Sequence, residues 1–536
     1  MKINMRTKVK KIIKTNDENI NSTSFIDYLK NNSTYLIFIY IFTIALYGMW
    51  LAQYFVSFDA EGLYFSSNRI INNEWYYQWV ALGRWAFVFL KKILGVQVIN
   101  PFFSSSMFLI LFPLSSFLWH YYLEKIGFKS KNIFGKIIFD IIYISHPIWA
   151  LQFAYRNQIE VLSVISVLIP IVSYNFIFSI ENIKNKNNWI KLLLSSIGLV
   201  FCFAGYQAFI FMYILFMFVY LFSKAINNNF NAKEFWKKTI SIGLFSVLAF
   251  AIYIISTKIM CLIFDVHLGT SSYLGTQFAW LNSDLVHCFL HLSKYIVLSL
   301  FGDNVIFSCL FFVELVIAFV LFIINKKRIN NKFQKFTVFI MLIMVIISPF
   351  ILTIFTAATC VDRQQFSIIL LFSILAYIEY NFIVDHYKIF NNKYALCFLI
   401  IFISCFVVAH IQMNTRLLYS DFYTMRQDYS VYNNIYNKAL ELGAKPGSAI
   451  YVHGQTDNFP NDSIVEREVI GFSYTEVNSI APKKFVEAMI AEGFNVSFPT
   501  DEQVNKASEY VKKMKCYPDK DYIEVYENII IVKFSD

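Results

Sequence analysis

The sequence predicts an all-α polytopic membrane protein with about eleven transmembrane helices and a small C-terminal extracytoplasmic α/β domain. Of its 536 residues, 57% are hydrophobic and only 15% are charged, and the mean hydropathy is +0.51, which excludes an ordinary soluble protein. Apolar runs long enough to cross a bilayer recur along the chain. The lysines and arginines behind the net charge of +10 form short clusters between these runs. That pattern indicates membrane topology and not a nucleic-acid-binding face.

The predicted membrane domain covers residues 34–412 and follows a cytoplasmic N-terminal tail, residues 1–33. The apolar run after the tail is too long for a signal-peptide core. Stretches of about 20 apolar residues lie near 34–57, 101–123, 137–153, 158–180, 190–205, 206–223, 239–262, 304–324, 336–357, 366–384 and 394–412. With the N-terminus inside, the cytoplasmic loops hold roughly 25 positive residues and the outer loops about 7. An odd number of spans then places the C-terminal domain outside.

Two long outer loops and the C-terminal domain complete the predicted organisation. The loops cover residues 58–100 and 264–294, and within the first we expect an amphipathic, aromatic interfacial helix from Trp75 to Leu94. Residues 413–536 alternate helix-like and strand-like segments, which predicts a soluble α/β domain. Its expected helices are Tyr432–Leu442, Pro482–Glu492 and Asp501–Lys513, and its expected strands are Ser448–His453, Tyr522–Tyr526 and Ile529–Phe534.

The sharpest polar constellation lies in the first outer loop. Asp59 and Glu61 follow the first span directly, and the loop continues through Trp75, Trp79 and the Gly-Arg-Trp of residues 83–85. Carboxylates at a membrane boundary are often only solvated loop charges. Here a general base, a fixed cation and aromatic faces for a sugar ring fall within one short segment. That combination favours an active site.

A resemblance to a known family rests on these residues. The first span, the acidic pair, the Gly-Arg-Trp and a Gly-Tyr-Gln-Ala at residues 205–208 resemble the GtrII-type bacterial membrane glucosyltransferases of the polytopic GT-C superfamily, most strongly over residues 34–225. The resemblance implies transfer of glucose or a related hexose from an undecaprenyl-phosphate carrier to a cell-surface polysaccharide, such as O-antigen, on the outer face of the cytoplasmic membrane. It also implies that the acidic motif is catalytic. Between its two members we choose Asp59 as the base, with Glu61 beside it.

A lipid-linked donor agrees with the rest of the sequence. A glycosyltransferase that works outside the cytoplasm has no pool of nucleotide sugars, and the sequence has no GxGxxG turn or other Rossmann-type half to bind one. The donor must therefore arrive on a lipid. Transfer to a hydroxyl, which we expect to be inverting, needs a carboxylate to take the proton and a cation to hold the departing phosphate. Arg84 and Arg363 are outer-face arginines next to apolar spans and are our candidates for gripping that phosphate. The alternative is an ordinary arginine facing lipid headgroups.

Further candidates for substrate contact lie at the outer mouths of later spans. Tyr206 and Gln207 have groups that can hydrogen-bond sugar hydroxyls, or they form a satisfied polar pair at a helix start. Arg156 either neutralises Glu160 or joins the site with it. Among the other intramembrane acids, Asp140 lies near an inner mouth, where a loop lysine is an available partner.

The sequence gives no firm cofactor. The eight cysteines show no CxxC pattern. Asp284, His287 and His291 have a spacing compatible with metal binding, but no fourth ligand is evident. We therefore assign no metal ligands and leave a divalent metal ion open. The expected partners are a polyprenyl-phosphate sugar donor, a polysaccharide or lipid-linked glycan acceptor, and membrane lipid, with no nucleic acid.

Two rival functions remain at this stage. A polytopic transporter or lipid-linked-sugar flippase would also bury acids in its spans, but the sequence shows no internal repeat and no matching pair of broken spans. A non-catalytic assembly protein of the cell envelope is the other alternative, and in it Asp59 and Glu61 would be dispensable. The sugar, the acceptor and the linkage do not follow from the sequence.

Overall fold

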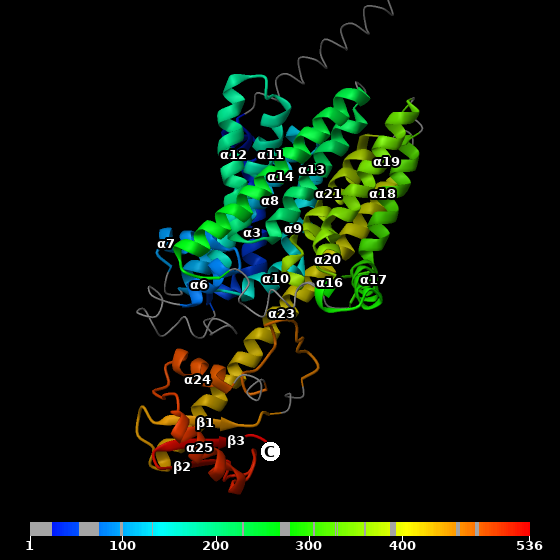
Figure 1. The fold of residues 1–536 in the computed structure, drawn as a ribbon. Helices are drawn as coiled ribbons and strands as arrows, with labels where there is room; N and C mark the ends of the chain where they lie inside the picture. Colours follow the sequence, from blue (N-terminus) through cyan, green and yellow to red (C-terminus); the bar gives the residue numbers. More distant parts are fainter. Residues whose placement is uncertain are drawn as a thin grey trace, which may run out of the picture.

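The computed structural model shows a helical bundle joined by one long helix to a small mixed domain (Figure 1). The structure describes residues 24–52, 74–96, 100–130, 132–227, 230–267, 279–303, 306–326, 329, 331–357, 361–385, 393–456, 461–476 and 482–536. The helices of the bundle are α2 (Phe25–Asn31), α3 (Ser33–Tyr47), α4 (Met49–Ala52), α6 (Glu74–Ala81), α7 (Trp85–Ile93), α8 (Pro101–Lys125), α9 (Ile133–Ser145), α10 (Pro147–Ala154), α11 (Ile159–Glu181), α12 (Lys186–Gly205), α13 (Ala208–Ile226), α14 (Ala232–Ile263), α16 (Ala279–Asn282), α17 (Leu285–Phe301), α18 (Leu310–Lys326), α19 (Lys332–Ile347), α20 (Ile351–Thr356) and α21 (Phe366–Asp385).

Eight helices in the described part of the chain are long and apolar enough to cross a membrane, or nine if the bent pair α9 and α10 is one span. The predicted number of eleven is therefore not confirmed. The shortfall has a physical reason, because α3 and α18 have only 15 and 17 residues. At 1.5 Å per residue such helices are about 22–26 Å long, shorter than a hydrocarbon core of about 30 Å.

The two ends of the bundle differ in character. Figure 1 shows α6, α7, α10, α16 and α17 at the end that faces the C-terminal domain, which we call the docking end. The opposite end carries the connections in which the sequence clusters its lysines, and we call it the lysine-rich end. This separation agrees with the alternation of loops that the charge pattern predicts.

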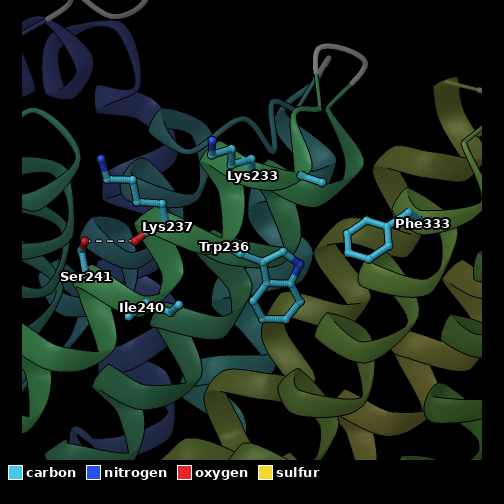
Figure 2. Close-up of a pocket in the computed structure, with 7 residues that line it drawn as sticks. Lys233, Trp236, Lys237, Ile240, Ser241 and Phe333 are labelled. Atoms are coloured by element: carbon cyan, nitrogen blue, oxygen red, sulfur yellow. Dashed lines mark hydrogen bonds between the residues drawn. The ribbon is translucent and has the colours of Figure 1, made fainter.

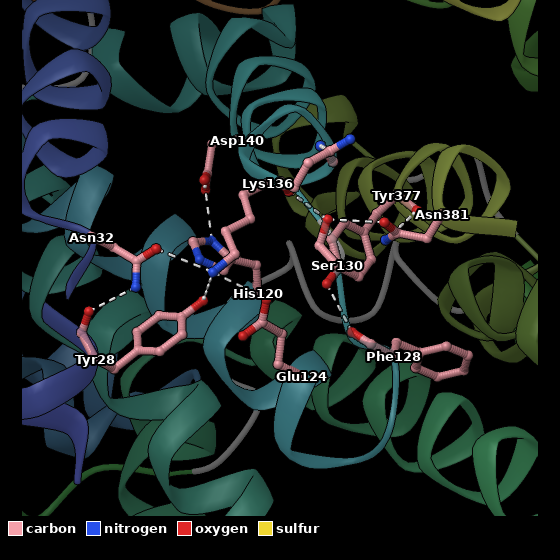
Figure 3. A network of polar contacts seen from close by, with 12 residues as sticks. Tyr28, Asn32, His120, Glu124, Phe128, Ser130, Lys136, Asp140, Tyr377 and Asn381 are labelled. Atoms are coloured by element: carbon pink, nitrogen blue, oxygen red, sulfur yellow. Dashed lines mark hydrogen bonds and ion pairs between the residues drawn. The ribbon is translucent and has the colours of Figure 1, made fainter. Parts of the chain in front are cut away.

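The core of the bundle is built from close helix contacts between α8, α11 and α12 and around the central helix α21. Ser115 of α8 donates a hydrogen bond of 2.8 Å to the backbone oxygen of Ser166 on α11. Small residues let helices approach closely in a membrane, where packing replaces the hydrophobic effect as the driving force. A polar network at the lysine-rich end adds to this packing (Figure 3).

In this network the partners of Asp140 are Ser116 and His120, and not a loop lysine. Asp140 accepts a short hydrogen bond from Ser116, and its other oxygen lies 3.1 Å from Nδ1 of His120. Lys136 instead pairs with Glu124 at 3.1 Å. Through Ser116, His120 and Asp140 the network ties α8 to α9.

The helix α23 (Lys393–Glu441) connects the bundle to the C-terminal domain. Its first part is apolar up to about residue 413 and its second part is polar, so the helix runs without a break across the boundary that the sequence placed at 412/413. The domain holds a three-stranded sheet in the order β1-β3-β2, with β3 parallel to β1 and antiparallel to β2. The strands are β1 (Ala449–His453), β2 (Ile523–Tyr526) and β3 (Ile529–Lys533), and the helices packed with them are α24 (Pro482–Ala491) and α25 (Asp501–Tyr510).

The prediction of one interfacial helix from Trp75 to Leu94 is wrong in one respect. The segment is divided into α6 and α7 at Gly83, whose φ of +81° lies in the left-handed region. A β-carbon at this position would come within 2.7 Å of the Tyr253 hydroxyl. Glycine is therefore required both by the backbone conformation and by the space. The break directs the residues after Gly83 toward α12 and α13.

Candidate functional site

The two sequence motifs, 83–85 and 205–208, meet at the docking end. Nε of Arg84 donates a hydrogen bond of 3.0 Å to Oε1 of Gln207. Nε2 of Gln207 in turn donates to the backbone oxygen of Leu82 at 2.6 Å and to the hydroxyl of Tyr253 at 3.1 Å. Gln207 thus uses both ends of its amide to hold the loop that carries Arg84, which fixes the position of this arginine.

Tyr206 lies next to Arg84 and packs against the start of the helix that follows Arg363. The guanidinium carbon of Arg84 is 4.6 Å from the centre of the Tyr206 ring, within the range of a cation–π contact. The centre of the Tyr206 ring also lies 5.9 Å from that of Phe366, three residues after Arg363, although Arg84 and Arg363 are far apart in sequence. Tyr206 is 2% exposed, so its buried ring connects the segment of Arg84 with the segment that follows Arg363.

Arg363 is held by two further residues. Its guanidinium carbon lies 3.9 Å from the centre of the Tyr155 ring, and Nη1 donates a short hydrogen bond to the Tyr155 hydroxyl. Nη1 also pairs with Oε2 of Glu468 at 2.5 Å, while the backbone N–H of Arg363 donates to Oε1 of Glu468 at 3.0 Å. Burial lowers the pKa of Arg363, but Glu468 and the two tyrosines outweigh it and raise the pKa above its ordinary value. Arg363 therefore stays charged.

Arg156 and Glu160 are both buried in the bundle, but they do not pair with each other. Glu160 forms a short ion pair with Lys91 of α7, and both side chains are fully buried. Arg156 is also buried, with its guanidinium carbon 5.1 Å from the centre of the Trp50 ring. It lies near Asp421 of α23. Burial raises the pKa of Asp421 to about 7, and the positive charge of Arg156 opposes this rise. The partner of Glu160 is thus a lysine that the sequence did not single out.

The other predicted site residues fall into two groups. Trp79 is buried on α6 and packs edge-on against Phe87, with ring centres 4.2 Å apart, so it supports the fold of this corner. Trp75 belongs to α6, but its side chain lies outside the described residues. Asp59 and Glu61 also lie outside the described residues.

No group of three or more metal-ligating side chains occurs within the described ranges. Asp284 caps the N-terminus of α17 by accepting a hydrogen bond of 2.6 Å from the backbone N–H of His287. The rings of His287 and His291 lie side by side, with centres 4.3 Å apart. The spacing of these three residues is explained by helix capping and ring packing.

A segment of the C-terminal domain, residues 461–476, reaches the site and is here called the docking segment. Arg416 of α23 donates to the backbone oxygens of Ser463 and Asp462 at 3.0 and 2.9 Å. The backbone N–H of Val465 donates to Oγ of Ser420 at 2.8 Å. These bonds hold the segment along α23, and its next residues, Arg467 and Glu468, contact the bundle.

Arg467 forms a second connection between the docking segment and the bundle. Its Nε lies 2.6 Å from Oδ2 of Asp362, and its Nη2 lies 2.7 Å from Oδ2 of Asp303. Burial raises the pKa of Asp362 to about 6, and the Arg467 guanidinium opposes that rise. Asp362 and Arg363 are neighbours in the short helical turn η3 (Asp362–Gln364), so the docking segment grips both.

The far end of the docking segment is held by Asp428, which allows a test by pH. Asp428 accepts a short hydrogen bond from Ser473 and one of 2.8 Å from the backbone N–H of Tyr474. Burial raises the pKa of Asp428 from 3.8 to about 7. The negative charge of Glu476 adds to this rise, and the two hydrogen bonds oppose it. The folded state therefore holds this proton more tightly than the unfolded state. The stability that protonation gives is present below pH 4 and is lost as the pH rises through about 7.

We expect Asp428→Asn to remove this dependence, because asparagine does not ionise. The difference in melting temperature, variant minus wild type, should rise between pH 4.5 and 7.5 and then stay constant. Thermal unfolding of the detergent-solubilised full chain at several pH values measures it. A difference independent of pH would show that Asp428 titrates at its ordinary pKa.

Two pockets among the described residues, near the lysine-rich end, are separate from this site. Figure 2 shows the first, an open hollow of about 530 Å³ beside Trp236 and Phe333, with Lys233 and Lys237 at its edge. The second, of about 210 Å³, is mainly apolar and lies between α13, α18, α19 and α21. Neither is lined by any of the predicted site residues.

The profile of the Glucosyl transferase GtrII family matches residues 48–378, more than half of the chain. The chain belongs to this family. The GtrII match spans Arg84, Arg156, Tyr206 and Arg363 but ends before the docking segment. Family membership and the apolar helices together support a membrane glucosyltransferase. No curated protein and no solved structure matches the chain.

Sequence reasoning missed four residues that contact the predicted site residues of this GtrII-family protein. Tyr253 lies within an apolar stretch and Tyr155 just after one, and a tyrosine is not distinctive in either place. Lys91 could have been singled out, because a lysine in a largely apolar segment needs a partner if it is buried. Glu468 carried none, because it lies in the soluble domain, 105 residues from Arg363.

Proposed function

We propose that this protein transfers glucose, or a related hexose, from a polyprenyl-phosphate donor to a surface polysaccharide or lipid-linked glycan. The observation that carries the proposal is the placement of Arg84 on the Tyr206 ring and of Arg363 on the Tyr155 ring at one end of the bundle. Two fixed cations beside an apolar bundle suit a phosphate whose lipid tail lies in the membrane. The bundle end that holds them is the outer face of the cytoplasmic membrane in this proposal.

The arginines keep donor groups available for a phosphate. Within the described residues, Nη1 and Nη2 of Arg84 have no hydrogen-bond partner, and neither have Nε and Nη2 of Arg363. Nε and Nη2 form the edge of a guanidinium that binds two oxygens of one phosphate. Because Gln207 and Glu468 fix the two arginines beforehand, little reorganisation is needed when negative charge develops on the leaving phosphate.

The reaction we propose is a single displacement at the anomeric carbon. The acceptor hydroxyl attacks C1, the bond from C1 to the phosphate oxygen breaks, and the polyprenyl phosphate leaves with the electron pair. Asp59 takes the hydroxyl proton, and Arg84 and Arg363 stabilise the departing phosphate. One displacement inverts the configuration at C1. The assignment of Asp59 rests on its sequence position after the first span.

The proposal is tested by activity of the purified protein in liposomes. We expect transfer of glucose from polyprenyl-phosphate glucose to a glycan acceptor, with no transfer from a nucleotide-activated glucose. Mass spectrometry of surface glycan from cells with and without the gene should show a difference of one hexose per modified repeat. Surface glycans of identical mass, with no transfer in liposomes, would refute a transferase and favour the transporter or assembly alternatives.

A further inference from the structure

The contact between the docking segment and Arg363 is the feature that the proposed function leaves unexplained. Glu468 belongs to the C-terminal domain and lies outside the range that matches the GtrII family. Both of its carboxylate oxygens are engaged by one residue, the proposed phosphate ligand Arg363. Its side chain is 8% exposed, so this ion pair is well shielded from water and is specific in its geometry.

The geometry distinguishes positioning of Arg363 from blocking of it. Glu468 takes the backbone N–H and Nη1, and Tyr155 takes Nη1 as well. Within the described ranges, the Nε–Nη2 edge of Arg363 makes no hydrogen bond. A carboxylate that imitated a bound phosphate would be expected on that two-donor edge. Glu468 instead grips the guanidinium from the side and leaves the edge for a ligand.

The docking segment is built to hold Glu468 in this place. Glu468 has φ +54°, which is uncommon for a residue other than glycine, and Arg467 and Ile470 pair through a tight turn around it. On one side the segment is bonded to α23 through Ser420, and on the other side through Asp428. Arg467 fixes the turn to the bundle through Asp303 and Asp362. An unusual backbone conformation persists only where such surroundings determine it.

We propose that Glu468 is a positioning residue for the donor phosphate, so that the C-terminal domain completes the donor site of the membrane domain. The inference rests on the proposed function, because it assigns a role to the partner of Arg363. Glu468 orients the guanidinium and keeps it in place while the donor enters and the product leaves. It does not touch the reacting atoms.

The test compares Glu468→Gln and Glu468→Ala with the wild-type full chain in liposomes. Glutamine keeps one acceptor oxygen but loses the charge, and alanine loses both. We expect the KM for polyprenyl-phosphate glucose to rise about 5- to 10-fold in Glu468→Gln and about 10- to 30-fold in Glu468→Ala, with the acceptor KM unchanged. Glu466→Gln is the matched control, because Glu466 is exposed and lies in the same segment.

A further variant keeps the test decisive if Glu468→Gln does not fold. Arg467→Gln loosens the same turn without altering either Glu468 or Arg363, and we expect the donor KM to rise about 3- to 5-fold. Elution volume and melting temperature of each variant show whether it is folded. If Glu468→Gln is unfolded, the result with Arg467→Gln decides.

The outcomes separate the inference from the proposed function. Wild-type transfer with an unchanged donor KM in the folded variants would overturn the positioning role alone. A lower donor KM or faster turnover in the variants would also overturn it, because Glu468 would then be a competitor of the phosphate. If the wild type neither transfers hexose nor binds polyprenyl phosphate, the proposed function fails and the inference falls with it.

Discussion

Replacing Arg363 by alanine should slow hexose transfer about 30- to 1,000-fold, which corresponds to about 2–4 kcal/mol in the barrier. The physical reason is that the contact between guanidinium and phosphate strengthens as the phosphate leaves and its charge grows. Arg363→Lys should remain impaired although it keeps the charge. Lysine can reproduce neither the planar stack on Tyr155 at 3.9 Å nor the two-oxygen grip on a phosphate.

The measurement is the dependence of the initial rate on polyprenyl-phosphate glucose at saturating acceptor. Arg84→Ala should show the same kind of defect, since Arg84 lies on Tyr206, whose ring packs near the segment that carries Arg363. Arg426→Ala is a suitable control, because Arg426 is an exposed arginine on α23 beyond the apolar stretch. Normal donor dependence in both Arg84→Ala and Arg363→Ala would show that the phosphate is held elsewhere.

Hydropathy and turn chemistry predict much of this fold. The helix α21 begins at Phe366 and ends at Asp385, within one residue of the predicted span 366–384. The strands β1 and β3 lie inside the predicted segments Ser448–His453 and Ile529–Phe534. These elements are fixed by local sequence, because each needs only its own apolar run and a flanking turn.

The elements that were predicted less well depend on features other than hydropathy. The sequence from 393 to 441 contains neither glycine nor proline, so nothing stops α23 where its apolar part ends. Conversely, Gly83 divides a segment whose composition alone favours one helix. The count of eleven spans assumed that every apolar run crosses the membrane, whereas α3 and α18 are shorter than the other spanning helices.

The site was only partly accessible to sequence reasoning. Arg84, Tyr206 and Gln207 were chosen from two motifs, and the fold brings them together over more than 120 residues. The role of Glu468 depends on how far α23 extends and on how the docking segment lies along it. Such distances are set by tertiary packing and leave no local pattern. For the same reason the sequence suggested Arg156 as a partner of Glu160, whereas the packing of α7 against α11 places Lys91 next to it.

Asp59→Asn should abolish hexose transfer while leaving the amount of protein in the membrane unchanged. Asparagine keeps the shape of the side chain but cannot accept the proton of the acceptor hydroxyl. Loss of a general base costs about 100- to 10,000-fold in rate, which makes this one of the two largest effects we expect. The assay is the liposome transfer reaction, with donor binding measured in parallel. Donor binding should be retained, because Arg84 and Arg363 are intact.

Two comparisons make the Asp59 result decisive. Glu61→Gln should be less severe, since we expect Glu61 mainly to orient the acceptor; the reverse order would exchange the roles of the two acids. Glu509→Gln, an exposed acid of the C-terminal domain, controls for loss of a carboxylate in general. Full transfer activity in both Asp59→Asn and Glu61→Gln would remove the acidic pair from catalysis. A transporter would keep uptake and an assembly protein would lose nothing, so only a transferase loses turnover while it is still inserted and still binds the donor.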